Sequence, residues 1–154
     1  MTLRIRFGLR SEKNGKVSMG LVELTRREVF SASHRLQNAS LSDIENEQLY
    51  GKCNNLNGHG HNYTWEVTLR GPINPKSGMV YNLANLKNEM KSVLDEVDHK
   101  NLDKDVVYFK NNVSTTENLI VYLWDELKSR IRNPELLYKM ILHETEKNSV
   151  TYHG

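Results

Sequence analysis

The sequence contains a single cysteine, Cys53, among its 154 residues. An intrachain disulfide is therefore excluded, and the composition fits a reducing compartment, so we expect a cytoplasmic location. No apolar run approaches the roughly 18 residues that a membrane-spanning helix needs. Basic and acidic residues nearly balance, at 21 and 19. The net charge of +2 gives no reason to expect nucleic acid or an anionic membrane as a partner.

The rest of the composition is that of an ordinary globular domain. Hydrophobic residues make up 38% of the chain and charged residues 26%, and the length suits one core. The first twenty residues carry several arginines and lysines but only one acid, Glu12, and they lack the apolar centre of a secretory signal. We expect residues 1–20 to be a flexible extension and residues 21–154 to form a single domain.

Two long segments alternate between apolar and polar residues, as strands with one buried face do. In residues 21–34 one alternate set is mostly apolar and ends at a histidine: Val22, Leu24, Phe30, Ala32 and His34. Val29 interrupts the opposite, polar set. In residues 59–70 the alternation is stricter, and one face is formed by His59, His61, Tyr63, Trp65, Val67 and Leu69. Residues 35–58 have no sustained period, and the length of this connection favours a functional loop.

The second half of the sequence predicts two helices followed by two strands. The two helical stripes are Leu83, Leu86, Met90, Val93, Leu94 and Val97, and then Ile120, Leu123, Trp124, Leu127 and Ile131. Ser114 and Glu117, just before the second stripe, match a capping box. Residues 136–144 alternate like a strand, and residues 149–153 can return as its hairpin partner.

This element order, ββααββ, predicts an α+β domain with a four-stranded antiparallel sheet and both helices on one of its faces. A four-stranded sheet with long edges exposes unpaired backbone groups. We therefore expect neighbouring subunits to pair with those edges.

The histidines near the middle of the sequence suggest a metal site. His59 and His61 share one face of a strand, roughly 6.5 to 7 Å apart along it, although a polar turn is the ordinary alternative. His34 ends the apolar face of the preceding strand, and an antiparallel pairing would bring it beside them. Three histidines with an open fourth position form the ligand set of a catalytic zinc site. All-nitrogen ligation favours zinc but leaves iron and copper open.

Five further polar residues have both a chemical and an ordinary interpretation. Cys53 lies in the polar loop YGKCNNLNG, where a nearby cation would favour its thiolate as base or nucleophile, but it could also be a packing cysteine. Asp98 and His99 are either a carboxylate with the imidazole that it orients or an ordinary helix end, and the sequence favours the helix end. Glu144 continues an apolar stripe, so it lies at the surface or pairs with matching donors. Glu117 has the same two interpretations, and its capping box favours the ordinary one.

Five motifs together resemble the 6-pyruvoyl tetrahydropterin synthase family: FSASHRL (30–36), GKCNNLNGHGHNY (51–63), LDEVDHKNLD (94–103), STTEN (114–118) and HET (143–145). The similarity runs from about Thr25 to Tyr152. The spacing between Cys53 and His59 resembles that of the animal-type enzyme, because the related bacterial 6-carboxy-tetrahydropterin synthases usually have a shorter one.

The resemblance implies a T-fold, or tunnelling fold, in which strands from three subunits close a barrel and two trimers stack into a homohexamer. Active sites would then lie between subunits. The implied activity is that of a zinc-dependent lyase, which eliminates triphosphate from 7,8-dihydroneopterin triphosphate and forms 6-pyruvoyl-tetrahydropterin on the route to tetrahydrobiopterin. The alternatives are a 6-carboxy-tetrahydropterin synthase, a side-chain-cleaving relative, or a non-catalytic zinc-binding module.

The resemblance also implies a role for individual residues. The metal ligands for Zn²⁺ would be His34, His59 and His61, and Cys53 would act as the general base.

The resemblance further implies that Asp98 and His99 complete the proton relay. Glu144, also among the catalytic residues, would accept hydrogen bonds from the amino-pyrimidinone edge of the pterin. The other residues expected to line the pterin pocket are Thr115, Thr116 and Glu117.

Overall fold

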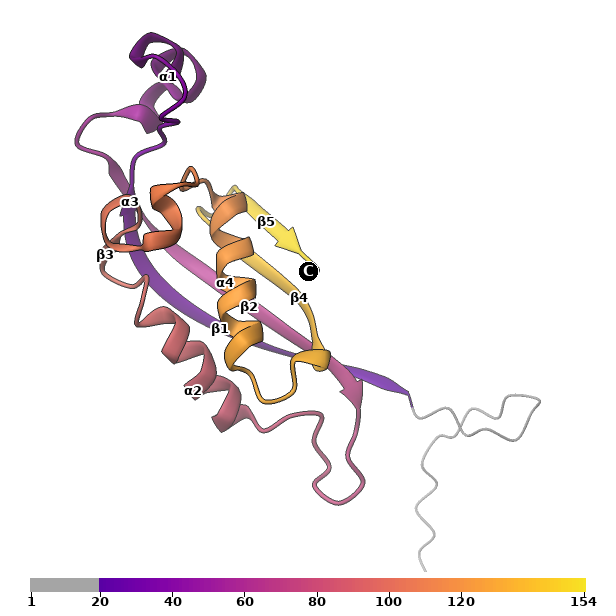
Figure 1. Cartoon of the computed structure of the whole chain (residues 1–154). Coiled ribbons are helices and arrows are strands. Elements are labelled where there is room, and N and C mark those ends of the chain that lie inside the picture. The colour runs from indigo at the N-terminus through magenta and orange to yellow at the C-terminus, as the bar shows by residue number, and fades with distance from the viewer. Residues whose placement is uncertain (1–19) are drawn as a thin grey trace, which may run out of the picture.

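Residues 20–154 are described by the computed structural model, which folds them into one sheet with helices across one face (Figure 1). The elements, in chain order, are β1 (Leu21–His34), α1 (Asp43–Tyr50), η1 (Gly51–Asn54), β2 (His59–Pro72), α2 (Leu83–Leu94), β3 (Lys100–Asn101), α3 (Leu102–Asp105), η2 (Val107–Lys110), α4 (Thr116–Arg130), η3 (Pro134–Leu136), β4 (Leu137–His143) and β5 (Ser149–Tyr152). The predicted extension over residues 1–20 lies outside the described residues, apart from Gly20. In the described part of the chain, no helix has the length and apolar character to cross a membrane.

The sheet has the strand order β3-β1-β2-β4-β5. Its centre is the antiparallel pair β1 and β2, which runs from Leu21 opposite Pro72 to His34 opposite His59. The pairs β2–β4 and β4–β5 are also antiparallel. As the sequence predicts, this register brings the histidine ends of the two long strands together.

The fifth strand, β3, corrects the prediction of a four-stranded, wholly antiparallel sheet. It runs parallel to β1 and pairs with Ala32 and Ser33. Just before it, the backbone N–H of His99 donates to the carbonyl oxygen of Ser31 at 2.7 Å. The Asp98 carboxylate accepts a hydrogen bond from the Ser31 backbone N–H at 2.9 Å. A strand of two residues is too short to show a period, so the sequence pattern does not reveal it.

The inner face of the sheet explains why β1 has an irregular pattern in its middle. Phe30 and Tyr63 are buried there and stack with ring centres 5.0 Å apart. Val29 faces the other way and is 62% exposed. Arg26 and Glu28 occupy half-buried positions on the side of Phe30 and form an ion pair at 2.5 Å. Two paired charges therefore replace apolar residues along this part of the strand.

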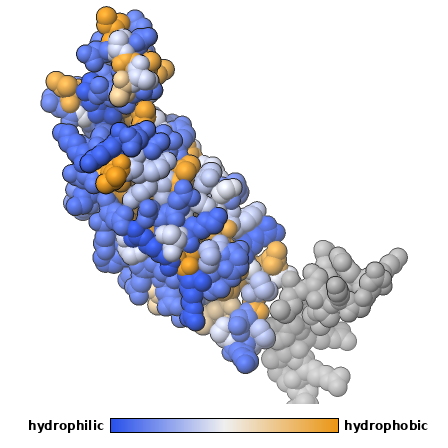
Figure 2. Space-filling model, in the orientation of Figure 1, coloured by the Kyte–Doolittle hydropathy of each residue, from blue (hydrophilic) through white to orange (hydrophobic). Residues whose placement is uncertain are grey.

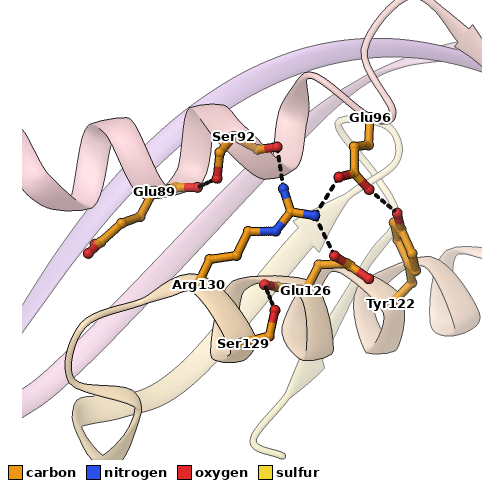
Figure 3. Close-up of polar contacts among 7 residues, drawn as sticks. All are labelled: Glu89, Ser92, Glu96, Tyr122, Glu126, Ser129 and Arg130. Carbon is orange, nitrogen blue, oxygen red and sulfur yellow. Dashed lines mark hydrogen bonds and ion pairs between the residues drawn. The ribbon is translucent and has the colours of Figure 1, made fainter.

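The two long helices, α2 and α4, lie side by side over this face (Figure 1). Their buried residues include Leu86, Met90, Leu119 and Leu123. Figure 3 shows Arg130 of α4 reaching across to α2, where Nη1 donates to a backbone carbonyl oxygen. The apolar stripes that predict these helices are thus the surfaces that bury them.

The start of α4 differs from the predicted capping box at Ser114 and Glu117. The N-cap residue is Thr115, whose side chain accepts a backbone N–H of the first turn. Ser114 precedes the cap and is buried. A capping box does form elsewhere, between Ser42 and Glu45 at the start of α1.

The strand β4 also differs in part from its predicted alternation. It begins at Leu137, and its pairing with β2 contains a register shift. Leu137 is therefore buried, whereas Tyr138 lies beside Arg70, whose guanidinium carbon is 4.7 Å from the ring centre. Beyond the shift, Met140 and Leu142 are buried as the alternation predicts.

Residues 35–58, which we call the arm, project beyond the histidine ends of β1 and β2 (Figures 1 and 2). The arm contains α1 and η1, which pack on each other. Because α1 has only eight residues and most are polar, it shows no amphipathic period in the sequence. The predicted functional loop therefore has a folded structure of its own.

Candidate active site

The histidine ends of β1 and β2 bring three imidazoles together. His34 lies opposite His59, and His61 follows two residues later on the same face. One ring nitrogen from each lies within 4.8 Å of the others. The ring centres of His34 and His59 are 4.6 Å apart, and those of His59 and His61 are 4.9 Å apart. These are the three residues that the sequence predicts as metal ligands.

The nitrogens of this triad are suited to a metal ion. In residues 20–154, His34 Nε2, His59 Nδ1 and His61 Nε2 are buried and have no hydrogen-bond partner. The other ring nitrogen of His34, Nδ1, donates to the carbonyl oxygen of Ser114 at 2.7 Å, which leaves the Nε2 lone pair available. Buried polar atoms are normally paired, so three unpaired nitrogens at one point fit a bound cation. The cluster could therefore hold a metal ion.

Burial also favours the neutral imidazoles that metal binding requires. Desolvation lowers the pKa of His34, and the neighbouring imidazoles lower it further, against the opposite effect of its hydrogen bond to Ser114. Desolvation likewise lowers the pKa of His61, although the carboxylate of Glu144 acts in the other direction. Both pKa values lie below the ordinary 6.5, so both rings are neutral near pH 7.

A cavity of about 590 Å³ opens beside the triad and is lined by His34 and His59. Its walls come from the arm, the start of α4 and the turn between β4 and β5. The sequence-predicted residues that line it are Cys53, Thr115, Thr116, Glu117 and Glu144. Cys53 lies in η1, at the base of the arm, and is half-buried. The structure therefore brings a thiol, two carboxylates and two histidines of the triad to one cavity.

Glu144 follows the last residue of β4 and lies next to the triad. Its Oε1 accepts a hydrogen bond from the hydroxyl of Thr116 at 2.6 Å and is 3.8 Å from His61 Nε2. The turn after β4 is closed by the backbone N–H of Glu144, which donates to the carbonyl oxygen of Asn148 at 3.0 Å. Within the described residues, Oε2 of Glu144 makes no hydrogen bond. A fixed carboxylate oxygen is thus available to a ligand with N–H donors.

Asp98 and His99 are paired, but one chain does not place them in this cavity. The Asp98 carboxylate is 2.9 Å from His99 Nδ1, and the side chain of His99 is 84% exposed. They lie beside Ser31 on the edge of β1, where His99 and His61 line another hollow of about 410 Å³. Desolvation raises the pKa of Asp98, but hydrogen bonds from Ser31 and His99 outweigh it and keep the pKa low. The carboxylate is therefore ionised and able to orient the imidazole.

Comparison with known proteins decides the family. The family model for 6-pyruvoyl tetrahydropterin synthase matches residues 23–154. The chain belongs to the 6-pyruvoyl tetrahydropterin synthase family. The 6-pyruvoyl tetrahydrobiopterin synthase of Drosophila melanogaster is 57% identical over 132 residues, covering 85% of this chain and 79% of that protein. The human enzyme is 53% identical over 133 residues, covering 86% of this chain and 91% of that protein.

The fold of this family matches as well. The solved structure of Caenorhabditis elegans 6-pyruvoyl tetrahydropterin synthase has a TM-score of 0.87 and 57% sequence identity, and the match covers 88% of this chain and 97% of that one. The α+β arrangement and its mixed sheet are therefore those of the family. A 6-carboxy-5,6,7,8-tetrahydropterin synthase from Aquifex aeolicus is much less similar, at 27% identity over 158 aligned positions.

Two residues near the candidate site are not singled out by sequence reasoning. The hydroxyl of Tyr63 is buried without a partner among residues 20–154, and its ring centre is 5.5 Å from that of His61. Burial raises the pKa of Tyr63, so its hydroxyl stays protonated as a possible donor. Tyr63 lies on the same alternating face as His59 and His61, and this position could have identified it from the sequence. Lys147 lines the cavity from the turn after β4, and only its closeness to Glu144 marks it in the sequence.

Proposed function

We propose that this member of the 6-pyruvoyl tetrahydropterin synthase family eliminates triphosphate from 7,8-dihydroneopterin triphosphate and converts the remainder to 6-pyruvoyl-tetrahydropterin, in tetrahydrobiopterin biosynthesis. The pterin ring gains hydrogens while the side-chain hydroxyls become ketones, so no nicotinamide is needed. The observation that carries the proposal is the cavity that Cys53 and Glu144 line together with His34 and His59, two members of the histidine triad. Its combination of metal ligands, a base and a carboxylate matches what such a reaction needs.

The metal in this proposal is zinc, held by His34, His59 and His61. Three neutral imidazoles and an open coordination position are the usual ligand set of catalytic zinc. When bound, the zinc would supply a Lewis acid that polarises the side-chain oxygens of the substrate and acidifies the adjacent C–H bonds.

Cys53 is the proposed general base. It lies in the polar base of the arm, and it lines the same cavity as two of the metal ligands. A nearby cation favours the thiolate, which is the form that accepts a proton. The proton removed from the substrate side chain would therefore move to the sulfur of Cys53.

Glu144 is the proposed anchor of the pterin. The amino-pyrimidinone edge presents N–H donors, and a carboxylate can accept two of them side by side. The hydrogen bond from Thr116 fixes the direction of this carboxylate before the substrate binds. Thr115 and Glu117 would line the pocket at the start of α4.

Asp98 and His99 are proposed to complete the proton relay from a neighbouring subunit. Within one chain they do not line the cavity. This fits an active site shared between subunits, as in the family's T-fold hexamer. The free edges of β1 and β5 fit the pairing of strands between subunits in a barrel.

Product analysis tests the activity. Purified protein loaded with zinc is incubated with 7,8-dihydroneopterin triphosphate, and the pterin product is identified by mass spectrometry. We expect 6-pyruvoyl-tetrahydropterin, with one inorganic triphosphate released per pterin. A carboxylated product or a cleaved side chain would assign the chain to the alternative reactions instead.

Substitution of Cys53 tests the assigned base. We expect Cys53→Ala to retain zinc and to bind pterin but to lose about 10²- to 10⁴-fold in kcat, the usual contribution of a general base. By contrast, His59→Ala should abolish stoichiometric zinc, measured by elemental analysis. Retained turnover in Cys53→Ala contradicts its role as the base, and unchanged zinc in His59→Ala contradicts the metal site.

A further inference from the structure

We propose that Arg35 and Asn54 form a hydrogen-bonded clamp that positions Cys53 against the cavity. The proposal rests on the proposed function of Cys53, and it makes both residues positioning residues, because neither is assigned a contact with the substrate. It concerns the base of the arm, where the chain leaves β1 after the metal ligand His34 and returns just before β2.

The arm needs such a fixed base because it projects away from the sheet (Figure 1). Its helix α1 packs on η1, and η1 carries Cys53. The position of the thiol relative to His34 is therefore set by the few contacts that join the two ends of the arm. Loops that carry catalytic groups are less precise than strands unless neighbouring groups hold them.

Four hydrogen bonds join these two ends. The backbone N–H of Leu36 donates to the carbonyl oxygen of Cys53 itself at 2.9 Å. The side-chain amide of Asn54 donates to the carbonyl oxygen of Leu36 at 2.7 Å. The guanidinium of Arg35 donates to the backbone and side-chain oxygens of Asn54, at 2.9 and 3.3 Å. Each bond ties a residue just after the metal ligand to Cys53 or to its neighbour.

Burial and further contacts make this clamp rigid. Asn54 is only 9% exposed, so the loss of one of its hydrogen bonds leaves a buried polar group unpaired. The Arg35 backbone N–H donates to the Asp103 carboxylate at 2.6 Å, which holds this end of β1 to α3. The clamp therefore connects Cys53 to the same rigid strand that carries His34.

The expected consequence is kinetic. A displacement of about 1 Å in a reacting group can cost on the order of 10²-fold in rate, without changing how tightly the substrate binds. A broken clamp should therefore lower kcat while KM and zinc content stay nearly constant. A purely structural role would not produce this separation, because general loosening of the site would affect zinc and substrate binding as well.

Asn54→Asp tests the clamp with a side chain of the same shape. It keeps the oxygen that Arg35 contacts but cannot donate to the carbonyl oxygen of Leu36 when ionised. The matched control is Asn46→Asp, since Asn46 is a buried amide of the same arm that donates to Asn38, Leu41 and Ser42 rather than to the base of the arm.

The measurements are kcat, KM, zinc content and the rate at which iodoacetamide alkylates Cys53, the single cysteine of the chain. For Asn54→Asp we expect kcat to fall by about tenfold to a hundredfold and the alkylation rate to change, with KM and zinc within about twofold of wild type. Asn46→Asp should keep the wild-type kcat and alkylation rate. If the wild type is active, the clamp is overturned by an unchanged kcat in Asn54→Asp. It is also overturned if Asn46→Asp loses as much kcat as Asn54→Asp. An inactive wild type instead overturns the proposed function, and the alkylation rates still test the clamp.

Arg35→Lys provides a second test in case Asn54→Asp fails to fold. It keeps the positive charge and loses the two-pronged contact with Asn54. The clamp predicts a lower kcat with an unchanged KM. A higher KM with an unchanged kcat would show that Arg35 binds the triphosphate of the substrate, and it would contradict a positioning role.

Discussion

Gly58 is the residue that allows the backbone of the arm to pass close to His34, a proposed metal ligand. Its φ is +71°, and a Cβ at this position would lie 2.8 Å from the backbone oxygen of His34. Both the conformation and the close approach therefore require glycine. The distance matters because His34 contributes one of the three nitrogens of the triad.

We predict that Gly58→Ala weakens both the fold and the metal site. The positive φ costs about 1–2 kcal/mol with a Cβ present, and the clash with His34 adds to this cost. Since the clash displaces a metal ligand, we expect zinc affinity to fall by about tenfold or more, as for loss of a group that orients a ligand. Calorimetry gives the Tm, and titration against a competing chelator gives the zinc affinity.

Gly78→Ala is the control for this prediction. Gly78 also has a φ of +71°, but a Cβ there meets nothing within 4 Å. It should lower the Tm modestly and leave zinc affinity unchanged. Equal zinc affinity in the two variants would show that the approach of Gly58 to His34 is unimportant for the metal.

The ligands of the triad can be predicted from the sequence because strand geometry is periodic. Residues two apart share a face, which groups His59 with His61, and an antiparallel partner supplies His34. The carbonyl oxygen of Ser114, which orients His34 from 80 residues further along the chain, could not be predicted. Every residue has a backbone carbonyl, so such a partner leaves no mark in the sequence.

At the scale of elements, the junction of α2 and α4 depends on an ion-pair network around Arg130 (Figure 3). Its guanidinium contacts the carboxylates of Glu96 and Glu126, and Tyr122 donates to Glu96 at 2.8 Å. The hydrogen bond from Arg130 is the main cause that lowers the pKa of Glu96 from its ordinary 4.5. A carboxyl group with a depressed pKa stabilises the fold above its unfolded pKa, and this stability is lost as the pH falls through the folded pKa.

We therefore predict that Arg130→Met reduces the acid sensitivity of the fold. Without the guanidinium, the pKa of Glu96 moves back toward its ordinary value in the folded state. The variant should have a lower Tm at pH 7 than the wild type, and its Tm should fall less between pH 5 and pH 3. Thermal unfolding followed by circular dichroism at each pH measures both effects.

Lys91→Met, on α2, is the matched control. Lys91 pairs with Asp95 at 2.8 Å, but both side chains are more than 60% exposed. Exposed pairs of this kind contribute only about 0.3–0.5 kcal/mol, so we expect little change in Tm or in its pH dependence. A pH dependence in Arg130→Met identical to that of wild type would contradict the role of the network.

The elements that sequence patterns predict are the long ones and the hairpin of β4 and β5. β1, β2, α2 and α4 each repeat their period several times, and each buries one face. The short elements β3, α1 and α3 do not complete enough of a period to be recognised. The position of β3 is fixed instead by contacts with distant residues, namely those of Asp98 and His99 with the backbone of Ser31.

At the scale of the whole molecule, the sheet of a single chain has free edges. Among the described residues, β1 pairs with β3 only at Ala32 and Ser33, and β5 is paired on one side. The proposed hexamer would cover such edges with strands from other subunits. The sequence pattern can indicate that edges exist, but which subunit covers them depends on surfaces that no single-chain pattern describes.

Mixed oligomers test whether the active site is shared between subunits. Cys53→Ala and His99→Ala are each expected to be inactive alone, because each lacks one member of the proton relay. If Cys53 works with His99 of a neighbouring subunit, random 1:1 mixing leaves about a quarter of the sites with both residues intact, by simple subunit statistics in a closed ring. Co-expression, native mass spectrometry to confirm six copies, and turnover per zinc measure this recovery.

Co-expression of Cys53→Ala with His59→Ala should restore nothing, because those residues belong to the same cavity of one chain. Absence of recovery in the Cys53→Ala and His99→Ala hexamer would place the whole relay within a single chain.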